Sequence, residues 1–436
     1  MSVISALLTY WRGVYACLVR GASYAELTRA LPHLESASLL QIYWLCLHVR
    51  LFHEPHYRSG TFGNDCAKNL RNVALPGTGV ALSLACASRA FAASFVALAV
   101  PFAALAAACV RRMHERRDCR ATTTSLGEAF ACALLPRAVI KSEGRDPWDG
   151  YTWFAFWRLN CVLASYHALK TGETGYALED KLTFLEACEK EQVPASPWLR
   201  ETARLVVKHR NEEGGLGLHT FTNAACGGDW ILQAWLRNGE TIARLLPSEA
   251  PLSTLRLVSA SRACCKRDGG VGSGGAHGKG RANEDDVSVL SGCFRAGREG
   301  ATTDHSCVMF DLDLVSGILK NATSNSHWYQ LGAAKAWNCA WASEGHTMAT
   351  HPDTGVRVAG ESIPNIDECV ALVRRAHARL LPNVPLVGWD VAITEEAGTC
   401  LLEANLSCNF FRASFDEKAY FTFVEDVLKA IEDEAL

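Results

Sequence analysis

The stretch that decides the fold is VGWDVAITEEAGTCLLEAN, residues 387–405. Two apolar runs flank the turn-like sequence 395–398, so the stretch predicts two antiparallel strands joined by a tight connection. Asp390 lies on the first run, and Glu403 and Asn405 lie two residues apart on the second. Residues two apart on a strand share a face, so the pairing predicts an all-oxygen cluster suited to Mg2+. The alternative is that these are merely exposed strand residues, although carboxylates among apolar neighbours are seldom buried without a partner or a cation.

A second signal lies upstream, at LVVKHRNEEGGLG, residues 205–217. The β-branched apolar run predicts a buried strand that ends near Lys208, and Gly214, Gly215 and Gly217 follow in a loop. Backbone N–H groups of a glycine loop can cover phosphates, and a lysine adds a point charge to the same oxygens. A plain hairpin turn would have a similar sequence, so the pattern by itself leaves both interpretations open.

The rest of the C-terminal part predicts a mixture of strands and helices. Residues 148–198 predict two helices separated by a GETG turn, and a further helix is expected over 366–381. Strand-like runs are DWILQAWL (229–236), TLRLVSAS (254–261), VSVLSGCFRAG (287–297) and CVMFDLDLVSG (307–317). The mixed order indicates an α/β or α+β domain. The glycine-rich residues 267–286 predict a flexible loop, and the alternative of a G-x-G-x-x-G phosphate loop lacks the helix that should follow it.

Residues 1–145 are apolar and predict helices. Between residues 73 and 110 the only charged side chain is Arg89, and residues 91–110 are long enough to cross a bilayer at about 1.5 Å per residue. A buried core helix is the alternative, because the run is alanine-rich and contains Pro101. The arginines that follow at 111–120 would place a catalytic C-terminal part in the cytoplasm, membrane-associated or anchored by a single span. The first residues lack a basic segment, so no signal peptide is expected.

Composition excludes several function classes. The formal net charge is -3, which provides no basic field for a nucleic-acid partner. The 18 cysteines form no C-x-x-C pair, and the chain is too long for a small disulfide framework, so reduced intracellular thiols are expected.

Taken together, these motifs resemble the ATP-grasp superfamily, and more narrowly its sugar-transfer-associated group, which is related to alpha-L-glutamate ligases. The resemblance covers about residues 148–436 and leaves out the N-terminal region. It is carried by EDKLTFLEAC, LVVKH…EGGLG, DWILQAWLRNGETIARL, STLRLV, VLSGCFRAGREGATTDHS, HPDTGVRVAGESIP and VGWDVAIT…LLEAN. Two departures are the TDHS segment, where relatives more often have asparagine after the aspartate, and the insertion at 267–286.

The resemblance implies a fold in which two subdomains hold ATP between them. The implied boundaries are an apolar, helical N-terminal region at 1–145, a helical lead-in at 146–200, a small subdomain with the glycine loop at 201–255, and a large subdomain with the magnesium site at 256–436. It implies that ATP is bound by Lys181, Lys208, Gly214, Gly215, Gly217 and a hinge of Gln233, Ala234 and Trp235. It further implies that Asp390, Glu403 and Asn405 hold Mg2+, that Arg256 and Arg295 stabilise the transferring phosphoryl group, and that Asp304 and His305 line the substrate pocket, supported by residues 351–355.

The implied activity is an ATP-dependent carboxylate–amine ligase that forms an acyl phosphate and releases ADP and phosphate. Its substrates would be a small carboxylate and an amine, or a sugar or lipid-linked acceptor, and residues 73–110 would keep it near a membrane. Two alternatives stay open: a kinase-like phosphotransferase with the same fold, and a non-catalytic nucleotide-binding component of a membrane-bound polysaccharide assembly.

Overall fold

The computed structural model describes isolated helical residues between 4 and 171, and then residues 172–200, 204–208, 218–265, 283–304, 307–324, 348–406, 408–411 and 413–434. The glycine loop that includes Gly214, Gly215 and Gly217, the insertion 267–282 and His305 lie outside the described residues. The apolar segment 91–110 is described only at Phe102, Leu105 and Cys109. Within the part of the chain that the structure describes, no helix combines the length and apolarity needed to cross a membrane.

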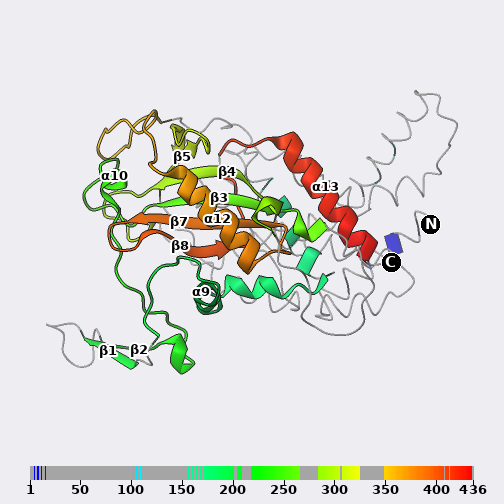
Figure 1. The fold of residues 1–436 in the computed structure, drawn as a ribbon, viewed down its shortest axis with the longest axis horizontal. Helices are drawn as coiled ribbons and strands as arrows, with labels where there is room; N and C mark the ends of the chain where they lie inside the picture. The colour runs from blue at the N-terminus through cyan, green and yellow to red at the C-terminus, as the bar shows by residue number, and fades with distance from the viewer. Residues whose placement is uncertain are drawn as a thin grey trace.

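A six-stranded antiparallel sheet forms the centre of the protein (Figure 1). Its spatial order is β6-β5-β4-β3-β7-β8. The strands are β3 (Thr254–Ser261), β4 (Val287–Ala296), β5 (Val308–Leu312), β6 (Leu319–Ser324), β7 (Leu386–Thr394) and β8 (Gly398–Asn405). The mixed fold predicted from the sequence is therefore confirmed, and every strand of this sheet except β6 lies on a run that the sequence predicts as a strand.

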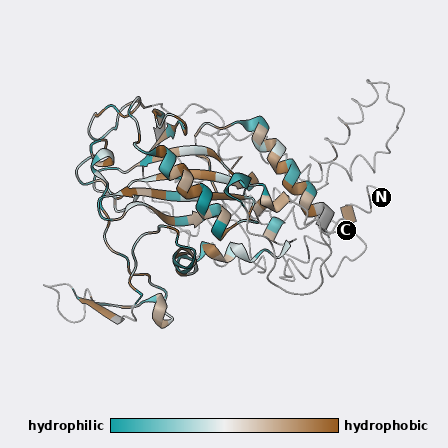
Figure 2. Cartoon of the chain, in the orientation of Figure 1, coloured by the Kyte–Doolittle hydropathy of each residue, from teal (hydrophilic) through white to brown (hydrophobic). Residues whose placement is uncertain are grey.

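Helices cover both faces of this sheet. On one face, α9 (Lys181–Lys190) and α12 (Ile366–Leu380) enclose the main core, which includes Trp389 and Phe294, both 0% exposed. Figure 2 shows hydrophilic residues on the side of α12 turned to the viewer, as expected of a helix whose apolar side is buried. On the other face, α13 (Glu417–Glu434), which the sequence analysis did not predict, and helical residues between 156 and 168 pack over the ends of β3 and β7 through a second core. The second core does not cover the opposite ends of β3 and β7 on this face, and polar side chains, including Arg256 and Asp390, lie there.

Short 3-10 helices and one short α-helix complete the described part: η1 (Thr174–Glu179), η2 (Ala224–Cys226), α10 (Glu240–Ala243), η3 (Ala263–Cys265) and η4 (Glu284–Asp286). The break between the helical residues before 172 and η1 falls at the predicted GETG turn. Asp180 caps α9, since its carboxylate accepts a hydrogen bond from the backbone N–H of Thr183 at 2.9 Å. This cap fixes where α9 begins and therefore where Lys181 lies.

Two of the sequence predictions about strands are wrong. The run at 204–208 does form a strand, β1 (Arg204–Lys208), paired with β2 (Leu218–Thr222), but it is exposed rather than buried, with Val206 at 59%. Figure 1 shows this hairpin projecting away from the large sheet, and no layer formed by the described residues covers it. The run 229–236 makes only isolated bridges, one of them between Gln233 and Trp198. The apolar run at 204–208 thus forms a strand without being buried, whereas 229–236 packs partly against the cores through Ile231 and Leu236 without joining a strand ladder.

A buried histidine lies between α12 and the sheet. His377 is 0% exposed, and its Nε2 lies 2.9 Å from the carbonyl oxygen of Val384, which requires that nitrogen to carry the proton. Nδ1 then accepts from the hydroxyl of Ser259 at 2.7 Å, and that hydroxyl accepts from the indole N–H of Trp389 at 2.8 Å. Both ring nitrogens are satisfied in the neutral form, and burial disfavours the charged imidazole.

We expect the free energy of unfolding to fall by about 2 kcal/mol between pH 7 and pH 5 because of His377. Burial lowers the pKa of this imidazole to about 4 from its ordinary value of 6.5, against a smaller opposing effect of the Val384 hydrogen bond. The unfolded chain therefore takes up the proton first as the pH falls, and stability present above pH 6.5 is lost down to pH 4. Urea unfolding of the wild type and His377→Gln at both pH values measures it. An equal pH dependence in the two proteins would contradict the assignment.

Candidate active site

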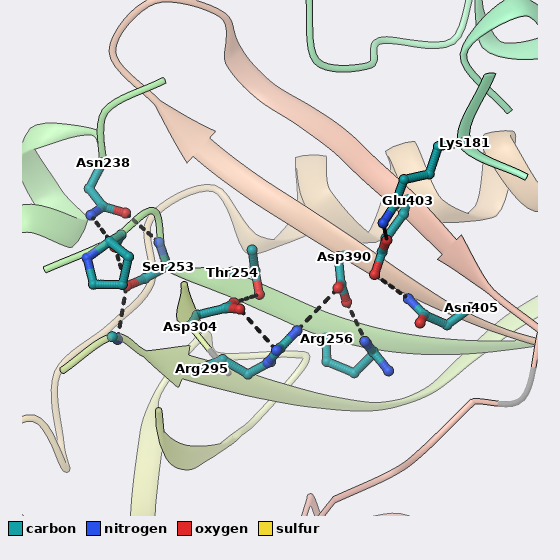
Figure 3. Close-up of polar contacts among 12 residues, drawn as sticks. Lys181, Asn238, Ser253, Thr254, Arg256, Arg295, Asp304, Asp390, Glu403 and Asn405 are labelled. Atoms are coloured by element: carbon teal, nitrogen blue, oxygen red, sulfur yellow. Dashed lines mark hydrogen bonds and ion pairs between the residues drawn. The ribbon is translucent and has the colours of Figure 1, made fainter. Parts of the chain in front are cut away.

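Four neighbouring strands bring charged residues onto one face of the sheet (Figure 3). Asp390 on β7 lies directly across from Arg256 on β3 and from Glu403 on β8. Arg295 on β4 lies across from Thr254 on β3. The antiparallel pairing predicted for residues 387–405 is therefore confirmed, with the β7–β8 register that places the two carboxylates side by side.

The centre of the cluster is a buried carboxylate held by two arginines. The Nε of Arg256 donates to Oδ1 of Asp390 at 2.5 Å, and the Nη1 of Arg295 donates to Oδ2 at 3.1 Å. Asp390 is 5% exposed, and the two arginines are 7% and 8% exposed. Burial alone raises the pKa of the Asp390 carboxyl, but the two guanidinium groups outweigh it and hold that pKa below its ordinary value. Asp390 is therefore an anion whose charge is already shared by two cations.

Arg295 also holds a second carboxylate. Its Nη2 lies 2.9 Å from Oδ1 of Asp304, whose other oxygen accepts the hydroxyl of Thr254 at 2.5 Å. Burial raises the pKa of the Asp304 carboxyl, and the attraction of Arg295 offsets this only in part. The Nε of Arg295 is buried and has no hydrogen-bond partner among the residues that the structure describes. Three predicted site residues, Arg295, Asp304 and Asp390, are thus in direct contact.

The other two predicted metal ligands, Glu403 and Asn405, lie at the edge of this cluster. Lys181, the first residue of α9, pairs with Glu403 at 3.0 Å, and the side-chain amide of Asn405 donates to the other oxygen of Glu403 at 3.3 Å. The side chains of Lys181 and Glu403 are 63% and 30% exposed, so this pair is open to solvent. The described residues contain no group of three or more His, Cys, Asp or Glu side chains that could hold a metal ion.

The donor chemistry nevertheless fits Mg2+. This ion is commonly held by one or two carboxylates together with substrate phosphates, and it prefers oxygen ligands. Asp390 and Glu403 offer two carboxylates on neighbouring strands, and Asn405 adds an amide oxygen. Oδ1 of Asp390 accepts from Arg256 and Oδ2 accepts from Arg295, and a carboxylate oxygen has further lone pairs that could bind a cation. A cation at Glu403 would take the place of the ammonium group of Lys181.

An aromatic side chain that the sequence analysis missed lies over the arginines. The ring centroid of Phe411 lies 5.3 Å from the guanidinium carbon of Arg256 and 5.8 Å from that of Arg295, within cation–π range. The chain reaches this position by crossing Gly388, where a Cβ would lie 2.8 Å from the Cβ of Cys408 and 3.3 Å from Cδ of Arg256. Glycine in the GWD triplet therefore permits the close approach. The signal in the sequence that could have indicated this residue is the aromatic pair Phe410-Phe411, which follows shortly after the E-A-N triplet at 403–405.

The HPDTG segment supports the loop that carries Asp304. Asp353 accepts two hydrogen bonds from the guanidinium group of Arg298, at 2.7 and 2.5 Å, and a third from the backbone N–H of Glu299 at 2.9 Å. His351, which is 0% exposed, lies with its Nε2 3.0 Å from the carbonyl oxygen of Gly297. These contacts fix residues 297–299, just after the strand that carries Arg295.

The residues predicted to bind the nucleotide are described only in part. Lys208 ends β1 on the projecting hairpin (Figure 1). Gln233 donates through its side-chain amide to the hydroxyl of Ser196, the N–H of Ala234 donates to the carbonyl oxygen of Pro197 at 3.2 Å, and Trp235 is 87% exposed. Two of the three residues predicted as the hinge, Gln233 and Ala234, are therefore tied to residues 196–198, and the third, Trp235, is exposed.

Comparison with known proteins found one matching family model and two similar solved structures. Residues 298–413 match the family model described as sugar-transfer associated ATP-grasp. No curated protein matches the chain. Among solved structures, the D-alanyl-alanine synthetase A of Vibrio cholerae O1 biovar eltor str. N16961 is 11% identical with a TM-score of 0.25, over 59% of this chain and 65% of that one, which is under two thirds of its length. The ATP-grasp ligase PsnB, complexed with a minimal precursor, is 11% identical with a TM-score of 0.27, over 64% and 70%.

Proposed function

We propose that this chain, whose residues 298–413 belong to the ATP-grasp superfamily, is an ATP-dependent carboxylate–amine ligase. The observation that carries the proposal is the pair of neighbouring carboxylates, Asp390 and Glu403, next to the buried cation Arg295. Two carboxylates at such an edge suit a magnesium nucleotide, and a planar cation suits the spread charge of a phosphoryl group in transfer. The proposed acceptor is an amine on an amino acid, a sugar or a lipid-linked molecule.

The proposed reaction has two steps. An oxygen of the substrate carboxylate attacks the γ phosphorus of ATP and ADP leaves, which forms an acyl phosphate. The amine then attacks the acyl carbon, phosphate leaves, and the amine loses a proton. Mg2+, when bound, would neutralise charge on the phosphates. The residues proposed to hold it are Asp390, Glu403 and Asn405, while Lys181 releases Glu403 and turns its charge towards the nucleotide.

The arginine cluster contributes preorganised charge to this reaction. Arg295 is held from two sides by Asp304 and Asp390, and Arg256 is held by Asp390. Cations fixed in a buried setting need no reorganisation when charge develops on the transferring group, and such fixed groups are the largest single contribution in many enzymes. We propose that Phe411 limits the access of water to the same two guanidinium groups.

The proposed organisation follows the boundaries 1–145, 146–200, 201–255 and 256–436. In that organisation the hairpin β1–β2, with Lys208 and the loop of Gly214, Gly215 and Gly217, covers the phosphates of ATP. Gln233, Ala234 and Trp235 hold the adenine, and Asp304 with His305 lines the pocket for the substrate.

We expect the purified protein to release ADP from Mg-ATP when pooled carboxylates and amines are added, and to form a hydroxamate when hydroxylamine replaces the amine. Hydroxylamine intercepts an acyl phosphate, so the hydroxamate identifies both the intermediate and the carboxylate. Chelation of the metal by EDTA is expected to abolish both signals. Transfer of phosphate to a hydroxyl compound without hydroxamate would instead indicate a kinase-like enzyme. Binding of Mg-ATP without turnover of any pool would indicate a non-catalytic nucleotide-binding component.

A further inference from the structure

A pair of adjacent cysteines lies outside the candidate active site. Cys264 and Cys265 end the short helix η3, which follows β3 and packs against α13. Arg256 is near the opposite end of β3, so the pair is separated from the charged cluster by the length of that strand. Both cysteines are half-buried, whereas most other described cysteines are buried. The proposed ligase chemistry gives this pair no role.

The two sulfur atoms point towards each other. Their separation is 3.7 Å, and the Sγ of Cys264 also donates to the carbonyl oxygen of Ser261 at 3.0 Å. Two thiolates bound to one tetrahedral centre at about 2.3 Å are roughly 3.8 Å apart. The pair is therefore close to the separation of two sulfur ligands on a shared atom, and a pyramidal trivalent centre, whose bond angle is narrower than the tetrahedral one, would draw the two sulfurs slightly closer by side-chain rotation.

A disulfide between these residues is disfavoured by the backbone. Adjacent Cα atoms are about 3.8 Å apart across a trans peptide bond, whereas disulfides usually need about 4.4–6.8 Å. The described residues contain no cis peptide bond. Closing the S–S bond would require distortion of the turn, but binding one atom between the two sulfurs would not.

The electrostatic setting favours thiolate formation. The side-chain hydrogen bond between the two thiols lowers the pKa of the Cys265 thiol, provided that the single S–H of Cys264 turns from Ser261 to Cys265; burial and the Asp426 carboxylate oppose this, and Arg262 adds a smaller lowering effect. The thiolate is the form that acts as nucleophile and as ligand. By contrast, burial raises the pKa of Cys188 to about 12, so that thiol stays protonated.

The described residues provide no third cysteine, histidine or carboxylate ligand beside the pair. A zinc ion would need two further ligands, because structural zinc sites are four-coordinate. The pair therefore suits a thiophilic atom that binds only two protein sulfurs and already carries its third substituent. A trivalent organoarsenical has this character, since its third substituent is carbon.

We propose that Cys264 and Cys265 form a bidentate binding site for trivalent arsenicals. With an arylarsenic(III) oxide, two As–S bonds form and the bonds from arsenic to oxygen break. The two thiol protons leave with that oxygen as water, and arsenic remains trivalent. The hydrogen bond of Cys264 to Ser261 is exchanged for an As–S bond, while the backbone of η3 is kept.

Phenylarsine oxide added to the full-length protein tests the site, read as intact mass and as the mass of the peptide containing residues 264–265. We expect one adduct on that peptide, which persists in excess monothiol and is removed by a dithiol. Chelation by two linked groups raises affinity by about 10²–10⁴ over one group. Cys264→Ser and Cys265→Ser are each expected to lose that factor, whereas Cys226→Ser, at another half-buried cysteine, is expected to retain the adduct.

Three results would overturn the proposal: no adduct on the 264–265 peptide, an adduct that monothiol removes, or equal retention in the single variants. Circular dichroism of each serine variant checks that the fold is intact. Because the measurement is of arsenic binding and not of turnover, its outcome is independent of the ligase proposal.

Discussion

Asp390→Ala is expected to lower the free energy of unfolding by about 3–5 kcal/mol, the largest effect on stability that we expect of a single substitution in the cluster. Its carboxylate accepts from both Arg256 and Arg295, and all three side chains are at least nine-tenths buried. Arg295 would keep Asp304 as a partner, but Arg256 would be left as a buried cation with no other carboxylate partner among the described residues. The main cost is therefore the unpaired charge and not the lost contact.

Urea unfolding of Asp390→Ala, of Asp390→Asn and of Glu395→Ala measures this effect. Asp390→Asn keeps the shape and removes the charge, so it remains informative if the alanine variant does not fold. Glu395 lies in the turn between β7 and β8 and contacts Arg237 at 2.8 Å, but both side chains are exposed, so Glu395→Ala should cost less than about 1 kcal/mol. Equal losses at positions 390 and 395 would show that the cluster does not stabilise the fold as described.

Glu403→Gln is expected to reduce turnover by on the order of 10²–10³ and to leave stability nearly unchanged. Glu403 is the more exposed of the two central carboxylates, and its ion pair with Lys181 is open to solvent. Loss of that pair should change the free energy of unfolding by less than about 1 kcal/mol. The substitution removes charge where the metal is proposed to bind, while glutamine can still contact Asn405 and Lys181.

Two measurements separate this prediction from a folding defect. Urea unfolding reports stability, and the affinity for ATP measured with and without Mg2+ reports the metal-dependent part of binding, even where the substrates are unknown. We expect Glu403→Gln to lose that metal dependence and Glu395→Gln to keep it. A variant at position 403 that binds Mg-ATP like the wild type and retains turnover would remove Glu403 from the proposed site.

Much of the central sheet could be predicted from the sequence because its strands are local patterns. Alternation and length identified β3, β4, β5, β7 and β8, and the short connection between β7 and β8 required them to be antiparallel neighbours. That local constraint also placed Asp390 across from Glu403. The same reasoning wrongly predicted that strand 204–208 is buried and that residues 229–236 form a strand. An apolar run reveals neither whether another layer covers it nor whether it pairs with a neighbouring strand.

The sequence by itself therefore determined the β7–β8 hairpin, the oxygen-bearing side chains on it and the mixed class of the fold. Only the tertiary structure decided that β3 lies between β4 and β7, which brings Arg256, Arg295 and Asp390 together from positions far apart in the chain. It also decided that Phe411 lies over both arginines. Strand order depends on long-range packing of side chains and not on local preference, and the burial that follows from it turns three surface-like charges into a fixed cluster.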